Sequence, residues 1–170
     1  MPEHDDLEYQ AHVHVEPSQL SLCSLLVHCQ GQFSRDGRYG GRQHERDVFA
    51  GFSFGAAVGL RAACEDARVR ALIGVGTPVA PVADDADTPR TYTFEFLREC
   101  ARPKLFVSGE RDRFGPRPKL EALVASLPEP KKLVFIEGAD HFFEGRLREL
   151  RQTIEEWVKE TLRSQLSALS

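Results

Sequence analysis

Short apolar runs alternate with helical patterns between residues 47 and 168. Four such runs, each flanked by glycine or charged residues, are Val48–Ala50, Ala71–Val75, Leu105–Val107 and Leu133–Ile136. Short, mostly apolar runs are typical of strands that are covered on both faces of a sheet. The pattern therefore predicts four buried strands.

Apolar residues at helical spacing follow the first, third and fourth of these strands. The three sets are Ala56, Ala57, Leu60 and Ala63; Leu120, Leu123 and Val124; and Leu147, Leu150, Ile154, Trp157, Val158 and Leu162. The last set follows the spacing of an amphipathic helix, with charged residues between. Strands that alternate with such helices pair in parallel through right-handed crossovers. We expect an α/β fold, with a mostly parallel sheet and flanking helices.

Two segments depart from this rhythm. Residues 1–46 combine an acidic start, a short alternating stretch, one apolar patch and a part rich in glycine and arginine, so we expect an irregular N-terminal segment. Residues 76–98 contain three prolines, which favour a loop that leads into a short helix around Phe94–Cys100. This loop is also the one candidate lid. We expect residues 47–170 to form a single domain.

The first predicted strand runs directly into the pattern G-x-S-x-G, formed by Gly51, Ser53 and Gly55. This spacing requires a sharp, strained turn between strand and helix that exposes the serine hydroxyl above the sheet. A side chain on either glycine would collide with neighbouring backbone. The N-terminus of the following helix directs free N–H groups at the site, which suits a developing oxyanion. We expect Ser53 to be a nucleophile; the alternative is a tight glycine turn with an idle serine.

A serine nucleophile needs a base that takes its proton and a carboxylate that orients the base. His141 is the one histidine downstream of Ser53, and it follows the last predicted strand. Asp112 follows the preceding strand, and catalytic groups of open α/β sheets gather at these carboxyl ends. Glu110 and Asp140 are rivals for the acid, although Asp140 adjoins the histidine and adjacent residues rarely meet in the required geometry.

The segments GFSFGAAVGLRAA, KLFVSGERDRFGP and LVFIEGADHFFEGRL carry a family resemblance. They are similar to a bacterial subgroup of small serine hydrolases related to the dienelactone hydrolases. Residues 47–168 resemble the second half of an α/β-hydrolase, with the three candidate residues in the order of that family. The resemblance implies a Ser53 nucleophile, an Asp112 acid and a His141 base, with the backbone N–H of Phe54 as one oxyanion donor.

The N-terminal half of that fold is expected to be reduced or missing. Only 47 residues precede Val48, whereas the implied fold has four strands there, and each parallel crossover needs a dozen or more residues. A truncated or misread gene product and a natural half-domain are both compatible with this. The nucleophile strand would then lie near a sheet edge, which favours aggregation or a homodimer unless residues 1–46 cover it.

The family's second oxyanion donor comes from a loop after an earlier strand. The stretch Leu25–Gly31, with the sequence LLVHCQG, could be a remnant of that strand and turn. The helix, strand and helix that should come between this stretch and the nucleophile strand are not there. The alternative is that this stretch is unrelated to that strand and turn of the family.

Composition is that of an ordinary globular chain of 170 residues, with 28% charged and 41% hydrophobic residues. A domain of this length can bury roughly 70% of its unfolded surface, so it needs no metal or disulfide for its core. Twenty-two Lys and Arg against 26 Asp and Glu give a net charge of −4, which argues against a nucleic-acid or membrane-surface partner. No apolar run approaches the ~18 residues of a membrane span.

Two further features of the sequence predict the cellular location of the protein. The acidic first ten residues lack the cationic start of a signal peptide. The cysteines lack paired spacing, which favours reduced thiols; they are Cys23, Cys29, Cys64 and Cys100. We expect a cytoplasmic protein.

Two groups of residues other than Ser53, Asp112 and His141 suggest ligands only weakly. The first could hold zinc, but its spacing matches no paired-ligand pattern, and a strand face is favoured; it comprises His12, His14, Cys23, His28 and Cys29. The second could cradle phosphate, but no phosphate-loop pattern follows a strand, and a solvated loop is favoured; it comprises Arg35, Arg38, Arg42 and Arg46. We expect no metal and no cofactor.

Aromatic residues flank the candidate serine and histidine. Phe52 and Phe54 either line an acyl pocket or pack in the core, and the sequence does not separate these two interpretations. The Phe142–Phe143 pair is expected to pack.

Two functions fit the sequence. The first is a serine hydrolase that cleaves a small-molecule carboxylic ester or thioester through Ser53, His141 and Asp112. The second is a catalytically inactive half-hydrolase that acts as an interaction or structural module. Substrate identity is not encoded in any motif of the chain.

Overall fold

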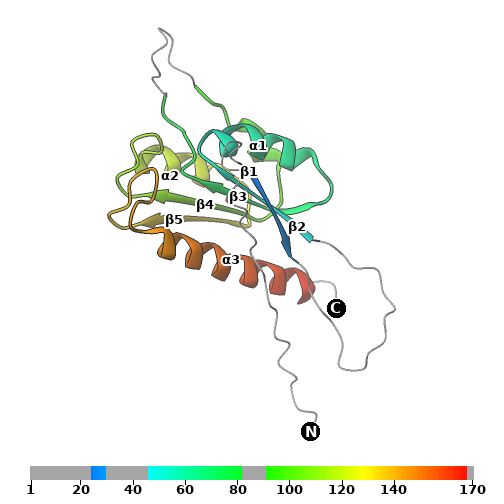
Figure 1. Ribbon diagram of the computed structural model, residues 1–170. Helices are drawn as coiled ribbons and strands as arrows, with labels where there is room; N and C mark the ends of the chain where they lie inside the picture. The colour runs from blue at the N-terminus through cyan, green and yellow to red at the C-terminus, as the bar shows by residue number, and fades with distance from the viewer. Residues whose placement is uncertain (1–23, 30–45, 82–90, 168–170) are drawn as a thin grey trace.

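The computed structural model describes residues 24–29, 46–81 and 91–167. Figure 1 shows a sheet with helices on both sides. The elements in chain order are β1 (Ser24–Cys29), β2 (Arg46–Phe52), α1 (Phe54–Glu65), β3 (Val69–Val75), a 3₁₀ helix (Glu95–Glu99), β4 (Lys104–Gly109), α2 (Arg117–Ala125), β5 (Lys131–Ile136) and α3 (Leu147–Ser167). All four predicted strands, the three predicted helices and the short helix before β4 are confirmed.

The strands form one sheet in the order β1-β2-β3-β4-β5, in which β2 to β5 run parallel. This confirms the predicted α/β architecture. Each strand extends past its predicted apolar run by up to two residues at either end, since sheet hydrogen bonding does not stop where apolar character stops. The parallel arrangement brings the carboxyl ends of β2, β4 and β5 to the same edge of the sheet (Figure 1).

The core has two layers, one on each face of the sheet. Alternate strand residues, such as Ile73 and Val107, face α3 and pack against Trp157 and Leu162. Their neighbours, such as Phe106, face the other way, toward α1, α2 and the 3₁₀ helix. Because both faces of the sheet are covered, consecutive positions along each strand are apolar, as the sequence pattern indicated.

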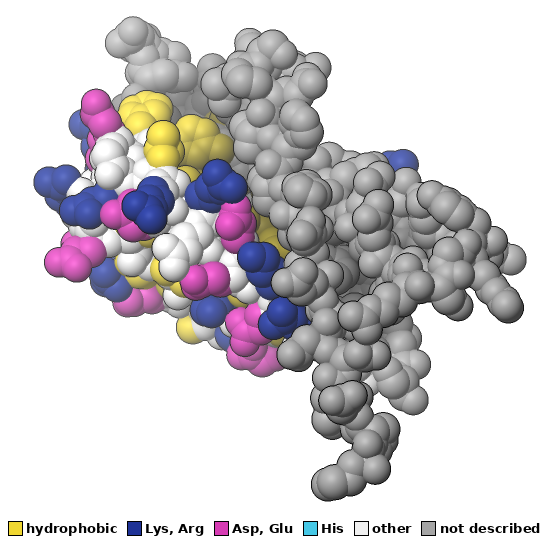
Figure 2. All heavy atoms as spheres, turned by 60° about the horizontal axis from the view of Figure 1, so that its bottom comes forward, with side chains coloured by type: hydrophobic (Ala, Val, Ile, Leu, Met, Phe, Trp, Pro, Cys, Tyr) yellow, Lys and Arg dark blue, Asp and Glu magenta, His cyan; other side chains and the backbone are white. Residues whose placement is uncertain are grey.

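The side of helix α3 that faces away from the sheet is exposed to solvent. Figure 2 views the face that α3 covers, with Lys and Arg side chains interspersed with Asp and Glu side chains. Some of these charged side chains form salt bridges along the helix, such as Arg151 with Glu155 at 2.6 Å. No helix among the described residues combines the length and apolar character that a membrane crossing requires.

Strand β1 pairs with β2 in the antiparallel direction, with Ser24 opposite Gly51 and Cys29 opposite Arg46. Strand β2, which precedes Ser53, is therefore not the outermost strand of the sheet. The end of β1 lies beside the start of β2, at the end of the sheet away from Ser53. The described part of Leu25–Gly31 runs antiparallel to β2 and ends away from Ser53, which does not favour a remnant that leads toward the serine. Residues 30 and 31, the expected turn, lie outside the described residues.

Several expectations fall outside the described residues. They include His12, His14, Cys23, the arginines at 35, 38 and 42, and residues 82–90 of the candidate lid. Within the segment 1–46, β1 and the first residue of β2 are described, so the expected irregular character of the remainder stays a prediction. Cys64 and Cys100 are free thiols.

Candidate active site

Ser53 occupies a strained turn between β2 and α1. Its φ of 52° and ψ of −119° lie outside the regions that side-chain-bearing residues favour. The Ser53 N–H donates to the carbonyl of Val75 at 2.9 Å, which ties the turn to the end of β3. A Cβ on Gly51 would lie 2.7 Å from the Gly55 carbonyl oxygen and 2.8 Å from Ala56, so the predicted need for glycine at 51 is confirmed.

Asp112 is buried in the loop after β4, and both of its oxygens are fully engaged. Oδ1 accepts the backbone N–H groups of Phe114 at 2.9 Å and Gly115 at 3.2 Å. Oδ2 accepts the Ser108 hydroxyl at 3.2 Å and faces His141 Nδ1 at 2.9 Å. Four hydrogen bonds on a buried carboxylate fix its orientation and compensate for lost hydration.

His141 connects Asp112 with Ser53. Its Nδ1 lies 2.9 Å from Asp112 Oδ2, and its Nε2 lies 2.9 Å from Ser53 Oγ. The loop that carries it approaches the end of β4 closely, because Gly109 leaves room for the backbone of Asp140. The structure thus brings together all three residues that the sequence singled out, from loops after three different strands.

Three phenylalanine rings surround the imidazole. Phe114 meets it edge-on at 4.7 Å between ring centroids, Phe142 edge-on at 5.2 Å, and Phe52 at 5.2 Å with a tilt of 35°. These rings leave only 7% of His141 exposed. Reduced water access strengthens the electrostatic interactions of the imidazole with its two partners.

The carboxyl group of Asp112 has a shifted pKa. Burial raises the pKa of Asp112, but the hydrogen bond and charge of His141 and the N–H groups of Phe114 and Gly115 outweigh burial and hold it below its ordinary value. Asp112 is therefore ionised at neutral pH and able to accept from His141.

The two rival carboxylates have other roles in the structure. Glu110 Oε2 accepts the N–H of Gly138 at 3.1 Å. Asp140 Oδ1 accepts the N–H groups of Phe142 and Glu144, at 3.0 and 3.2 Å. Each carboxylate holds the loop after β5 in shape, and neither is hydrogen-bonded to the imidazole of His141.

Helix α1 begins at Phe54, directly after Ser53. The Ser53 carbonyl accepts the N–H groups of Ala56 and Ala57, and no described residue accepts from the N–H of Phe54. A free N–H in the first turn of a helix is suited to bind a negatively charged oxygen. The Phe54 side chain is half-exposed, whereas Phe52 packs on the core that α3 covers.

Sequence reasoning missed two contributors. Ser108, at the end of β4, completes the hydrogen bonding of Asp112; its position four residues before the acid in a strand end was the available signal. Phe142 was expected to pack, but it is 68% exposed, and only Phe143 is buried. The difference arises because Phe143, at a positive φ of 55°, turns inward under α3 while Phe142 stays at the site.

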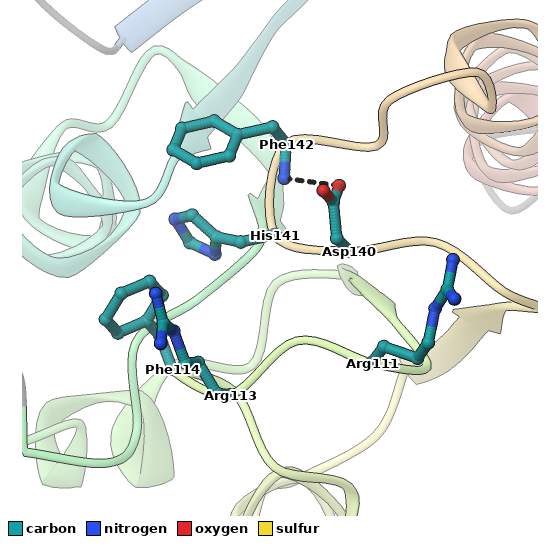
Figure 3. A pocket seen from close by; sticks show the side chains of 6 residues that line it. All are labelled: Arg111, Arg113, Phe114, Asp140, His141 and Phe142. Atoms are coloured by element: carbon teal, nitrogen blue, oxygen red, sulfur yellow. Dashed lines mark hydrogen bonds between the residues drawn. The ribbon is translucent and has the colours of Figure 1, made fainter.

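A pocket of about 280 Å³ opens beside His141. Figure 3 shows its lining from the loops after β4 and β5: Arg111, Arg113, Phe114, Asp140, His141 and Phe142. Within the described part of the chain, no group of three or more His, Cys, Asp or Glu side chains is placed to hold a metal ion.

A family model described as "alpha/beta hydrolase domain" matches residues 27–168, most of the chain. Together with the parallel sheet and the strained serine turn, this match establishes the class. The chain belongs to the alpha/beta hydrolase family.

The similarity to known proteins covers only part of the length of those proteins. An uncharacterised protein of Rickettsia prowazekii (strain Madrid E) is 24% identical over 119 residues, which are 67% of this chain and 47% of that protein. An Agrobacterium tumefaciens protein of unknown function, assigned to the alpha/beta hydrolases, superposes with a TM-score of 0.58 and 26% identity over 69% of this chain and 51% of its own. This chain spans about half the length of both.

A thermophilic esterase from Thermogutta terrifontis superposes with a TM-score of 0.56, over 68% of this chain and 65% of its own. At 18% identity, this likeness concerns the fold alone.

Proposed function

We propose that this protein is a serine hydrolase that cleaves a carboxylic ester or thioester through an acyl-enzyme. The observation that carries the proposal is the continuous chain of hydrogen bonds from Ser53 Oγ through His141 to Asp112, with both distances at 2.9 Å. Membership in the alpha/beta hydrolase family supports it. In this proposal Ser53 is the nucleophile, His141 the base and Asp112 the acid that orients the base.

The first half of the reaction transfers the acyl group to the enzyme. Ser53 Oγ attacks the acyl carbon while its proton passes to His141 Nε2, and Asp112 stabilises the resulting imidazolium through Nδ1–H. The free N–H of Phe54 donates to the oxyanion of the tetrahedral intermediate, an interaction worth about 3 kcal/mol in related chemistry. The bond from carbon to the leaving oxygen or sulfur then breaks, and the leaving atom takes the proton from Nε2.

The second half regenerates the serine. A water molecule gives a proton to His141 and attacks the acyl carbon, and the acid product leaves as Ser53 takes the proton back. The side chains and backbone groups named here supply every proton transfer, so the proposed reaction requires no cofactor.

A non-catalytic role is the second candidate, and the direction of β1 favours it. The family's second oxyanion donor follows an earlier strand, whereas β1 is antiparallel to β2 and ends at Cys29, opposite Arg46, at the end of β2 away from Ser53. Loss of one such donor costs roughly 10²–10³ in rate in related enzymes. A chain with this deficit would survive as an interaction module.

Labelling with a fluorophosphonate probe separates the two candidates. We expect purified wild-type protein to be labelled, and both Ser53→Ala and His141→Ala to lose labelling by roughly 10³-fold or more. Ser126→Ala is the matched control, because the hydroxyl of this exposed serine, which directly follows α2, donates to the Leu123 carbonyl and lies outside the site. Folded wild-type protein that stays unlabelled would overturn the hydrolase and support the module.

A further inference from the structure

The pocket beside His141 has a defined place in the proposed reaction, on which this inference rests. The leaving oxygen or sulfur must come within hydrogen-bonding distance of His141 Nε2 to receive its proton. The oxyanion, by contrast, faces the start of α1, where the free N–H of Phe54 lies. Because the pocket is lined by His141 and its neighbours and by no residue of α1, it lies on the side of the leaving group.

Positive charge prevails in this pocket. Among the described residues, Arg113 has neither an ion pair nor a hydrogen bond, and its guanidinium lies 5.4 Å from the centroid of the Phe114 ring. Arg111 donates to the Gly138 carbonyl and pairs with no described carboxylate. The one acidic lining residue, Asp140, already accepts two backbone N–H groups through Oδ1.

The backbone of Arg113 is fixed by the site itself. Its two neighbours in the chain are Asp112, with four hydrogen bonds, and Phe114, whose N–H is one of the donors to that carboxylate. The ring of Phe114 also contacts the imidazole at 4.7 Å. Arg113 is therefore tied to the same loop geometry that orients His141, unlike an arginine on a free surface loop.

Apolar surface completes the pocket. Phe142 is 68% exposed, although a phenylalanine that serves only packing is normally buried. It lies across the imidazole from Phe114, so two ring edges and a cation border one opening (Figure 3). A ligand that fills this opening needs an apolar part against the rings and a negative group at the guanidinium.

We propose that this pocket binds the leaving group of the substrate, and that the leaving group carries a negative charge recognised by Arg113. The substrate class is then an ester or thioester whose alcohol or thiol part bears a carboxylate or a phosphate. On acyl transfer the bond between Ser53 Oγ and the acyl carbon forms, the bond to the leaving atom breaks, and that atom takes the proton of His141 Nε2. Arg113 holds the departing anion but exchanges no proton.

Protection of Ser53 from fluorophosphonate labelling tests this assignment with small leaving-group mimics. The probes are 4-hydroxybenzoate for the carboxylate, phenyl phosphate for the phosphate, and 4-hydroxybenzamide as a neutral counterpart. In the wild type we expect at least one anion to protect about fivefold better than the amide, as for one partly exposed ion pair. The better anion identifies the charged group. Added salt should reduce the preference.

Two arginine variants locate the charge. Arg113→Gln should reduce the ratio of anion to amide protection to about one. Arg117→Gln is the matched control and should retain the wild-type ratio, because this arginine lies over the Phe135 ring at 3.9 Å and outside the pocket.

The outcomes separate this inference from the function on which it rests. If the wild-type protein is labelled but the anions and the amide protect it equally, or not at all, the anion site would be overturned and the proposed hydrolase function would be unaffected. An anion preference that persists in Arg113→Gln would have the same result. Absence of labelling in folded wild-type protein would overturn both.

Discussion

Ser53 and the pair of Asp112 and His141 are held in place by different forces. Ser53 lies in a turn whose shape is set by backbone contact between β2 and α1, with Gly51 against the Gly55 carbonyl. Asp112 and His141 lie in loops held by hydrogen bonds, four of them to the Asp112 carboxylate. The Ser53 side depends on steric fit, whereas the other side adds this set of polar contacts to a close backbone approach at Gly109.

This difference has consequences for how each side tolerates change. A steric contact at 2.7 Å leaves no room for one more carbon atom, and the backbone on both sides must move if one is added. A hydrogen-bonded carboxylate loses stabilisation in steps, one donor at a time. We therefore expect substitution of Gly51 to act on the fold and the site together, and substitutions of the hydrogen-bonding side chains on the β4 and β5 side to act on chemistry with the fold retained.

The largest effect is expected for Gly51→Ala. The added Cβ would separate β2 from α1, destabilise the protein by about 2–3 kcal/mol and displace Ser53. Urea unfolding should show the loss of stability, and fluorophosphonate labelling should be nearly abolished in the same protein.

Gly145→Ala is the matched control for this steric argument. Gly145 has a φ of 70°, but a Cβ added there would meet nothing within 4 Å, so alanine costs only the strained dihedral, about 1 kcal/mol. Labelling should persist. Equal destabilisation by the two variants would contradict the role of the close contact at Gly51.

The next effect is expected for Asp112→Asn, which keeps the volume of the side chain. An amide directed at Nδ1 donates instead of accepting, and this favours the imidazole tautomer with the proton on Nε2, where it can no longer accept from Ser53. Labelling should fall by roughly 10³–10⁴-fold. Glu110→Gln is the control, since Glu110 contacts the loop but not His141. Comparable losses in both variants would contradict the assignment of Asp112.

Much of this arrangement follows from the sequence alone. The apolar runs located β2 to β5, and the pattern around Gly51 and Ser53 predicted the strained turn, because both depend on local residue order. The order of Ser53, Asp112 and His141 along the chain was enough to predict that three loops converge, since parallel strands bring their carboxyl ends together.

The direction of β1 and the exposure of Phe142 could not be predicted. An apolar run specifies a strand but not its direction, which depends on how the preceding chain reaches the sheet. Adjacent phenylalanines have the same local preference, so the backbone path at Phe143 decides which ring is buried. Ser108 was overlooked for a similar reason: a serine at a strand end gains its role only from the loop that returns over it.

The smallest effect, expected for Ser108→Ala, tests whether hydrogen bonds on the β4 side act one at a time. The Ser108 hydroxyl stabilises the charged form of Asp112, so its removal should raise the folded-state pKa of that carboxyl toward its unfolded value. A folded pKa below the unfolded one adds stability above the unfolded pKa, and this stability is lost as pH falls through the folded pKa. The variant should therefore be about 1 kcal/mol less stable at neutral pH and approach the wild type in strong acid.

Unfolding curves across the acid range measure this convergence, with Ser126→Ala as the control for loss of an exposed hydroxyl. Labelling of Ser108→Ala should decline only about tenfold, since three of the four hydrogen bonds to Asp112 remain. If the stability difference from the wild type were the same at neutral and acidic pH, Ser108 would contribute packing and not a bond to the charged carboxylate. The expectation that each hydrogen bond to Asp112 contributes separately to stability would then be wrong for Ser108, which is its simplest test.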